Sequence, residues 1–252
     1  MTLHLLHEFL IDPNSTKNIL THNSYVPGVI VAVYVFYTKF FGPAIMKYKN
    51  PYNLQKAMII FNSLLVVGNA YAATTLLIWS LKYWHIRCDF KQQENYKIAI
   101  EESINYCWPL YLLKYAELMD TVFFVLRKKH KQISFLHVFH HSAVCLYFWR
   151  IMKNRQPSFY MYIVLTINSF VHVTMYFYYA LAAVGPKAKK YLWWKKYITT
   201  IQIVQFLTII AYMGHAHLTG CEILSTLDAS IMAIVLALTI LFLNFYIQTF
   251  RK

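Results

Sequence analysis

Long apolar stretches alternate with short polar segments along most of the chain. A helix needs about 20 predominantly apolar residues to cross the hydrocarbon core of a membrane, and stretches of that length recur here. No soluble domain, linker or clear internal repeat interrupts the series. The pattern predicts seven transmembrane helices, at about residues 27–43, 57–80, 106–126, 134–150, 159–184, 192–213 and 226–248.

The composition also indicates an all-α membrane protein. Of the 252 residues, 58% are hydrophobic and only 13% are charged, which lies outside the usage of soluble domains. We therefore expect a single transmembrane domain over residues 1–252, with an N-terminal segment at 1–26 and a tail at 249–252. The N-terminal segment lacks a basic stretch followed by a long apolar core, so we expect the first span to direct insertion instead of a cleaved signal peptide.

The formal net charge of +14 is unevenly distributed and predicts a topology. The connections after spans one, three, five and seven contain Lys and Arg but no Asp or Glu. The N-terminal segment and the 81–105 connection are nearly neutral, whereas Arg150, Lys153 and Arg155 do not fit this pattern. Because basic connections stay in the cytosol, we expect a luminal N-terminus and a cytosolic C-terminus. Membrane orientation accounts for the basic charge, and we expect no nucleic acid as a partner.

A sequon and the cysteines bear on the same topology. Asn14-Ser15-Thr16 is a glycosylation sequon, which is usable only in the lumen and so agrees with a luminal N-terminus. The four cysteines, Cys88, Cys107, Cys145 and Cys221, lack metal-ligand spacing. All except Cys145 fall toward the predicted lumen, where a disulfide can form, and their pairing stays open.

The strongest chemical signal is a histidine cluster at the start of the fourth span. His137, His140 and His141 are spaced i, i+3 and i+4, so a helix presents all three imidazoles on one face. Imidazole can serve as a base, a nucleophile or a metal ligand near neutral pH, and three of them inside a membrane are costly without a use. The alternative is a structural cluster that hydrogen-bonds neighbouring helices.

The third span carries ionisable residues that must face protein or water. Lys114, Glu117 and Thr121 are predicted to share a face, and Asp120 is placed to orient an imidazole from the next helix. Lys114 and Glu117 could contact substrate, or form an ion pair that helps helices associate.

The fifth and sixth spans add further candidates. Asn168 and His172 share one face by their i, i+4 spacing. The tyrosines that follow, at 176, 178 and 179, would by themselves indicate an interfacial aromatic belt. Gln202 either bridges helices or contacts substrate, whereas His215 and His217 fit solvated positions better.

Four motifs occur in order on spans three to six. They are Lys114-x-x-Glu117-x-x-Asp120-Thr121, Leu136-His137-x-x-His140-His141, Met175-Tyr176-x-Tyr178-Tyr179 and Thr199-x-x-Gln202. The ordered set resembles the very-long-chain fatty acid elongase family, from about Tyr25 to the last span. The tail departs from the dilysine retrieval pattern, because a Phe stands third from the end.

The resemblance implies a seven-helix protein of the endoplasmic reticulum, with six helices forming a barrel around a substrate tunnel. The implied reaction condenses a long-chain acyl-CoA with malonyl-CoA to give a 3-oxoacyl-CoA, carbon dioxide and CoA. No metal or other cofactor is implied. The reductases and dehydratase of the elongation cycle are implied partners, and homodimerisation stays open.

Roles for individual residues follow from the resemblance and the chemistry together. We expect His140 to attack the acyl thioester, while His137 and His141 orient it or move protons. His172 and Asn168 would position the malonyl thioester. The substrate-binding candidates are Lys114, Glu117, Asp120, Asn168, Tyr176, Tyr179 and Gln202, with Lys128 and Lys187 for the CoA phosphates.

Three alternatives are weighed against this hypothesis. A membrane di-iron desaturase or hydroxylase needs about eight histidine ligands in several boxes, and this chain has one box. A thiol mechanism would use Cys145, four residues after His141, although apolar burial disfavours its thiolate. A seven-helix receptor or transporter does not require three histidines on one face.

Overall fold

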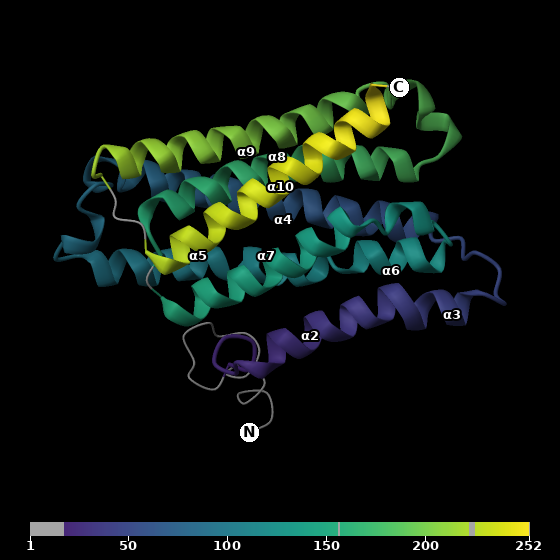
Figure 1. Ribbon diagram of the computed structural model, residues 1–252, viewed down its shortest axis with the longest axis horizontal. Helices are drawn as coiled ribbons and strands as arrows, with labels where there is room; N and C mark the ends of the chain where they lie inside the picture. The colour runs from purple at the N-terminus through teal and green to yellow at the C-terminus, as the bar shows by residue number, and fades with distance from the viewer. Residues whose placement is uncertain (1–17, 156, 222–224, 252) are drawn as a thin grey trace. The chain divides into compact units, whose positions relative to one another are not determined.

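The computed structural model describes residues 18–155, 157–221 and 225–251, and all regular elements within these ranges are helices (Figure 1). Its contacts divide the chain into two compact units. The first unit comprises residues 1–53 and 100–156, and the second comprises residues 54–99 and 157–252. Each unit is described below by itself.

The first unit begins with one long helical segment. It consists of α2 (Tyr25–Phe36), a π-helical turn η2 (Tyr37–Phe41) and α3 (Gly42–Met46). A Cβ atom at Gly42 would lie 2.7 Å from Val125 Cγ1, so a residue without a side chain lets this segment approach the helix that carries Val125. Val31, Tyr34 and Met46 enter a buried cluster with Val125 and Cys145, which forms the core of the unit.

The rest of the first unit consists of α5 (Tyr96–Ala116, of which residues from 100 belong here), α6 (Met119–Leu126), η5 (His130–Gln132) and α7 (Phe135–Asn154). The helix α7 begins at a defined point because the Ser134 side chain accepts a hydrogen bond from the His137 backbone N–H.

The sequence predicted one continuous helix over 106–126, and the structure corrects this. Helix α5 ends at Ala116 and α6 starts at Met119, so Glu117 and Leu118 form a turn between them. The backbone N–H groups of Leu118, Asp120 and Thr121 each bond to the carbonyl three residues earlier. This tighter i to i−3 pattern interrupts the α-helical ladder.

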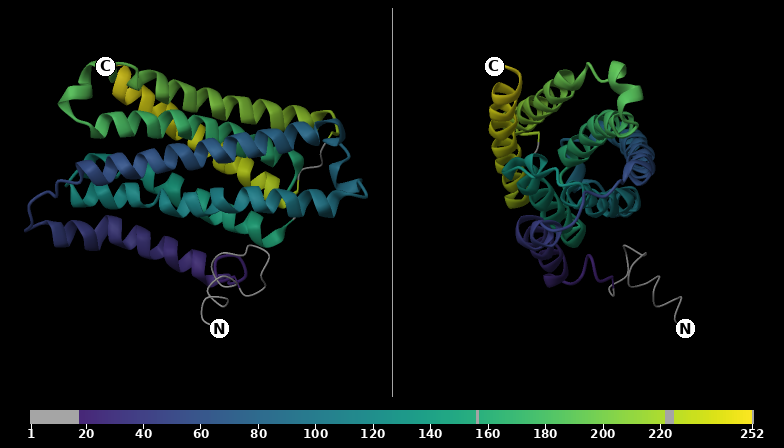
Figure 2. Two further views of the ribbon diagram at one scale, coloured as in Figure 1. Left: turned by 180° about the vertical axis from the view of Figure 1, so that it is seen from behind. Right: turned by 90° about the vertical axis from the view of Figure 1, so that its right-hand side faces the viewer.

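The second unit contains four long helices and short connecting turns. They are α4 (Gln55–Lys82), α8 (Phe159–Ala183), α9 (Lys195–Leu218) and α10 (Thr226–Phe250), with η3 (Trp84–Ile86), η4 (Phe90–Gln92) and η6 (Pro186–Tyr191) between them. Helices α4 and α8 run side by side (Figure 2). They are antiparallel, because Gln55 bonds to Val184 at one end and Trp79 packs on Tyr162 at the other.

Two links, a disulfide and a hydrogen-bond network, stabilise the second unit near the C-terminal end of α4. A disulfide joins Cys88 to Cys221, which answers the pairing question that the sequence left open. The buried Asp228 carboxylate accepts hydrogen bonds from Ser225 in a capping box and from the Ser158 hydroxyl at 2.7 Å. The starts of α8 and α10 are therefore linked to each other beside the disulfide-bonded connection.

Five helical segments of the described residues are long and apolar enough to cross a membrane. They cover Tyr25–Met46, Gln55–Lys82, Phe159–Ala183, Lys195–Leu218 and Thr226–Phe250. Each corresponds to a predicted span, so the prediction of an all-α, multi-pass membrane protein is confirmed. The other two predicted spans correspond to α5 with α6 and to α7, whose charged and histidine residues lower their hydropathy. Their crossing of the membrane stays a prediction.

Basic connections lie next to each other within each unit. In the first unit, Lys128 Nζ lies 3.4 Å from the carbonyl oxygen of Lys47, and the Tyr52 N–H bonds to the Leu126 carbonyl. In the second unit, the Gln55 bond to Val184 brings the start of α4 to the basic turn after α8. This grouping agrees with the predicted cytosolic side. Asn14 lies outside the described residues.

Candidate active site

The three histidines of α7 form a contiguous set of imidazole rings. The ring centroids of His137 and His141 are 4.4 Å apart, and those of His140 and His141 are 5.2 Å apart. His141 is buried, whereas His137 and His140 are half-buried. The central ring, His141, therefore packs against both neighbours.

A hydrogen-bonded chain orients His137. Its Nε2 atom lies 2.8 Å from the Thr121 hydroxyl, which in turn lies 2.8 Å from the Tyr34 hydroxyl. Tyr34 and Thr121 are both buried. A hydroxyl that bonds to one ring nitrogen holds the imidazole in one orientation, as carboxylates do for histidines in metal and catalytic sites.

The hydrogen bonds of Thr121 differ from the sequence prediction, whereas the predicted role of Asp120 stays untested. Thr121 was grouped with Lys114 and Glu117, but its hydroxyl is directed to Tyr34 and His137. Asp120, predicted to orient an imidazole, is buried in the first turn of α6, and that role stays a prediction. Sequence reasoning missed Tyr34, whose only signal was a hydroxyl inside the apolar 27–43 stretch.

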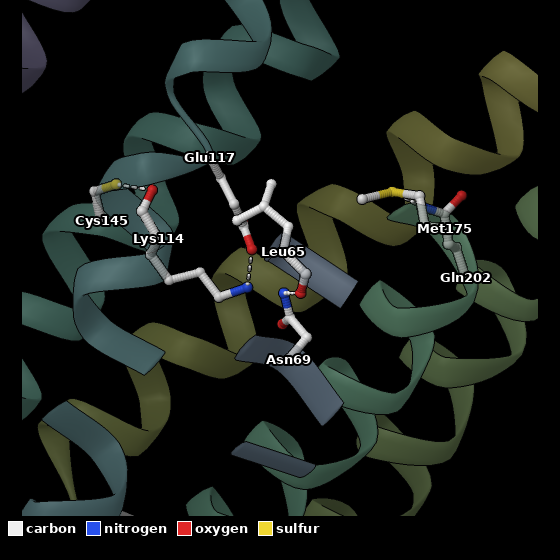
Figure 3. Close-up of polar contacts among 7 residues, drawn as sticks. All are labelled: Leu65, Asn69, Lys114, Glu117, Cys145, Met175 and Gln202. Atoms are coloured by element: carbon white, nitrogen blue, oxygen red, sulfur yellow. Dashed lines mark hydrogen bonds and ion pairs between the residues drawn. The ribbon is translucent and has the colours of Figure 1, made fainter. Parts of the chain in front are cut away.

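Lys114 and Glu117 form a buried ion pair at the turn between α5 and α6. Their Nζ and Oε1 atoms are 2.9 Å apart, and each side chain is only 1% exposed (Figure 3). Two charges removed from water in this way must stay paired, because either one left alone would carry the full desolvation cost. The pair favours the structural account of these residues, and their contact with substrate stays a prediction.

Cys145 of α7 packs against the same turn. The fully buried Sγ atom lies 3.3 Å from the Lys114 carbonyl oxygen, to which its S–H donates (Figure 3). The Cys145 side chain therefore belongs to the packed core and connects α7 to the end of α5.

The second unit holds the remaining candidates on α8 and α9. His172 and Tyr176 are buried with ring centroids 5.7 Å apart, and Tyr179 follows at 5.9 Å from Tyr176. Asn168 is half-buried on the same helix. The Gln202 amide N–H donates to the Met175 sulfur at 3.5 Å, which supports the helix-bridging alternative for Gln202 (Figure 3).

The two lysines predicted to bind CoA phosphates lie in basic turns. Lys128 follows α6 in a left-handed backbone conformation, and Lys187 is exposed in η6. Their flexible ammonium groups at helix ends suit phosphate binding.

Two buried asparagines of α4 were missed by sequence reasoning. Asn62 and Asn69 are seven residues apart on one helix face, and both are at most 2% exposed. Asn69 Nδ2 donates to the Leu65 carbonyl at 2.9 Å (Figure 3), but neither Oδ1 atom has a partner among the described residues. Two amides with this spacing in the apolar 57–80 stretch were the available signal.

The structure thus brings the candidates together as two sets. The first unit holds the α7 histidines with Thr121 and Tyr34, and the second holds His172 with two tyrosines. Among the residues that the structure describes, no three side chains of His, Cys, Asp or Glu are grouped so that they could hold a metal ion.

Buried histidines on a multi-pass helical scaffold identify this protein as a candidate membrane enzyme. Residues 19–252 match the model of the ELO family, described as the GNS1/SUR4 family, and the chain belongs to this family. The resemblance predicted from the four motifs is therefore confirmed. Membership leaves the receptor or transporter alternative without support.

Individual relatives are similar in sequence to this protein over most of its chain. A rat protein named very long chain fatty acid elongase 7 is 37% identical over 205 residues, which are 81% of this chain and 72% of the relative. Mouse very long chain fatty acid elongase 1 is 38% identical over 220 residues, which cover 84% of this chain and 76% of the relative. Human very long chain fatty acid elongase 4 is 35% identical over 217 residues, which cover 84% of this chain and 67% of the relative.

Proposed function

We propose that this protein is the condensing enzyme of very-long-chain fatty acid elongation, a 3-oxoacyl-CoA synthase. It joins a long-chain acyl-CoA to malonyl-CoA and releases carbon dioxide and CoA. Family membership over nearly the whole chain carries the proposal, and the set of contacting imidazoles supplies the chemical groups that the reaction needs.

The first step is acyl transfer to His140. A neutral ring nitrogen attacks the thioester carbonyl, the carbon–sulfur bond breaks, and the CoA thiolate leaves and takes up a proton from solvent. The acyl group is then held on the imidazole. The proton lost by the His140 ring passes to His141, whose ring lies at contact distance, and His137 assists from its fixed orientation.

The second step forms the new carbon–carbon bond. Malonyl-CoA loses carbon dioxide, and the electron pair of the broken bond gives an enolate that attacks the acyl carbonyl. The carbon–nitrogen bond to His140 breaks, and the ring nitrogen takes back the proton held by His141, which restores the histidine. His172 and Asn168 would donate hydrogen bonds to the enolate oxygen, as an oxyanion hole does.

The remaining candidates would bind the two substrates. Asp120, Tyr176, Tyr179 and Gln202 are proposed to contact the acyl or malonyl group, and Lys128 and Lys187 the CoA phosphates. We infer six helices around an apolar tunnel because a long acyl chain must be kept from water. An endoplasmic reticulum location with a luminal N-terminus is proposed from the charge pattern, and contacts with the reductases and dehydratase of the cycle from the pathway alone.

The test is incorporation of radiolabelled malonyl-CoA by purified protein in detergent, with a panel of acyl-CoA chain lengths. His140→Ala is expected to abolish incorporation, because the acyl acceptor is removed. His215→Ala is the matched control, since His215 is exposed on α9, and it should retain the activity. Equal loss in both variants would contradict the assignment.

The same assay addresses the iron-dependent alternative. If folded wild-type protein incorporates no label with any acyl-CoA, the metal content is measured next. Stoichiometric iron would then support the desaturase or hydroxylase hypothesis and overturn the condensation chemistry.

A further inference from the structure

An apolar groove lies on the surface of the second unit between α4 and α8. It encloses about 310 Å³ and is lined by Ile59, Val66 and Val67 of α4 and by Phe177, Leu181 and Val184 of α8. Of the described residues that line it, only Ser63 has a polar side chain. A groove of this composition suits a hydrocarbon chain better than any polar ligand.

The groove opens on a different face of α8 from the active-site candidates. Phe177, Leu181 and Val184 follow the helical spacing i, i+4 and i+7, and Phe177 is 51% exposed. His172 and Tyr176 lie on another face and are buried. The groove therefore faces the surroundings of the protein, which for a membrane-spanning helix are lipid.

A basic turn continues from the end of the groove. Gly185, with a φ of 84°, redirects the chain after Val184 into η6, where Lys187, Lys189 and Lys190 follow within six residues. The Gln55 side chain donates to the Val184 carbonyl at 2.9 Å, so the start of α4 is held where groove and turn meet. Apolar and basic surfaces are thus continuous within one unit.

The basic turn has the features of a headgroup site. Its lysines, together with Leu192 and Trp193, line a hollow of about 830 Å³. Trp193 is 75% exposed, as expected for a side chain at the membrane interface. The sequence contains no Asp or Glu between Asp120 and Glu222, so no acidic residue of this stretch offsets the lysines. The charge selects for an anion.

From this continuity we propose that the second unit binds an anionic phospholipid, with one acyl chain in the α4–α8 groove and the phosphate on Lys189 and Lys190. The substrate acyl-CoA has related chemistry, but its acyl group must reach the buried histidines, whereas this groove faces outward. The acyl-chain groove is therefore separate from the proposed reaction, although Lys187, which we propose to contact CoA, lines the same basic hollow as Lys189 and Lys190.

The experiment measures lipid retention by native mass spectrometry of the full chain in detergent. Dioleoyl phosphatidylserine and dioleoyl phosphatidylcholine are titrated in parallel, and phosphatidylserine should be retained preferentially. Lysophosphatidylserine, which has one acyl chain, should also bind, whereas glycerophosphoserine without an acyl chain should not compete. Free CoA, which lacks an acyl chain for the groove, should displace the lipid less effectively than lysophosphatidylserine does.

Two variants separate the parts of the site. Lys189→Gln/Lys190→Gln should weaken phosphatidylserine binding by about thirtyfold, which corresponds to about 2 kcal/mol for two lysines near a headgroup. Ala180→Leu should reduce binding by filling the groove. Lys187, proposed to bind CoA, is left intact in both variants.

The matched control is Lys47→Gln/Lys49→Gln, which removes the same charge from exposed positions in the connection before α4. It should bind phosphatidylserine as wild type does. Equal weakening by the control, unchanged binding by both site variants, or displacement by free CoA as effective as that by lysophosphatidylserine would each overturn the proposal. An unchanged unfolding midpoint in lipid-free detergent shows that the variants are folded.

Discussion

Thr121 illustrates how one side chain can connect two functions in the first unit. Its hydroxyl contacts both Tyr34 of α2 and His137 of α7, so it joins two helices and orients an imidazole. Buried hydroxyl and imidazole groups of this kind are costly when left without a partner. The same atom therefore contributes to stability and to the proposed chemistry.

Replacing Thr121 by Val keeps the shape of the side chain but removes its hydrogen bonds to Tyr34 and His137. The variant therefore tests the hydrogen bonds without disturbing the packing. We expect the free energy of unfolding to fall by about 1–3 kcal/mol. We expect kcat to fall more than KM rises, since His137 loses its orientation but no substrate contact. Tyr34→Phe, which removes only the outer hydroxyl, should give a smaller loss of kcat, and an equal loss would argue against the relay.

The Lys114–Glu117 pair gives a second prediction for individual residues. Lys114→Met should lower the free energy of unfolding by about 3–5 kcal/mol, because Glu117 is left charged and buried. The double variant Lys114→Met/Glu117→Leu should recover most of that loss. Thermal unfolding of the three proteins measures stability. A raised KM for acyl-CoA in a stable double variant would instead assign the pair to substrate binding.

At the scale of elements, the turn between α5 and α6 is the clearest departure from the sequence pattern. Apolar periodicity continues across Glu117 and Leu118, so a single helix was the natural expectation. The interruption coincides with the Lys114–Glu117 pair and the Cys145 contact to the Lys114 carbonyl. The Cys145 contact joins residues of two different helices, and the hydropathy of a single segment does not predict such a contact.

The disulfide between Cys88 and Cys221 tethers the connections before α5 and α10, and its removal should destabilise the second unit. The two cysteines are 133 residues apart, and closing a long loop restricts the unfolded chain strongly. We expect Cys88→Ser/Cys221→Ser to lose about 2–4 kcal/mol of stability. The unfolding midpoint with and without reductant is the measurement, and wild type should respond to reductant while the variant should not.

At the scale of the whole molecule, orientation in the membrane determines which residues meet cytosolic CoA esters. The basic connections adjoin one another within each unit, and the disulfide and the Asp228 network lie at the opposite end of the second unit. An oxidising lumen at the disulfide end would agree with the predicted topology.

Glycosylation at Asn14 tests this orientation directly. In microsomes the wild-type chain should show a mobility shift that glycosidase treatment removes, and Asn14→Gln should lack it. An engineered sequon in the connection between α6 and α7 should remain unmodified. Modification of that sequon with none at Asn14 would place the N-terminus in the cytosol.

The sequence by itself determined the all-α membrane class, the family and the histidine cluster, because these depend on local hydropathy and on i, i+3 and i+4 spacing along one helix. The tertiary structure alone decided that Thr121 and Tyr34 orient His137, that α5 ends at Ala116, and that Cys88 pairs with Cys221. The hydrogen-bonded chain and the disulfide join different segments of the sequence, and no periodicity of a single segment encodes which distant partner a side chain will meet.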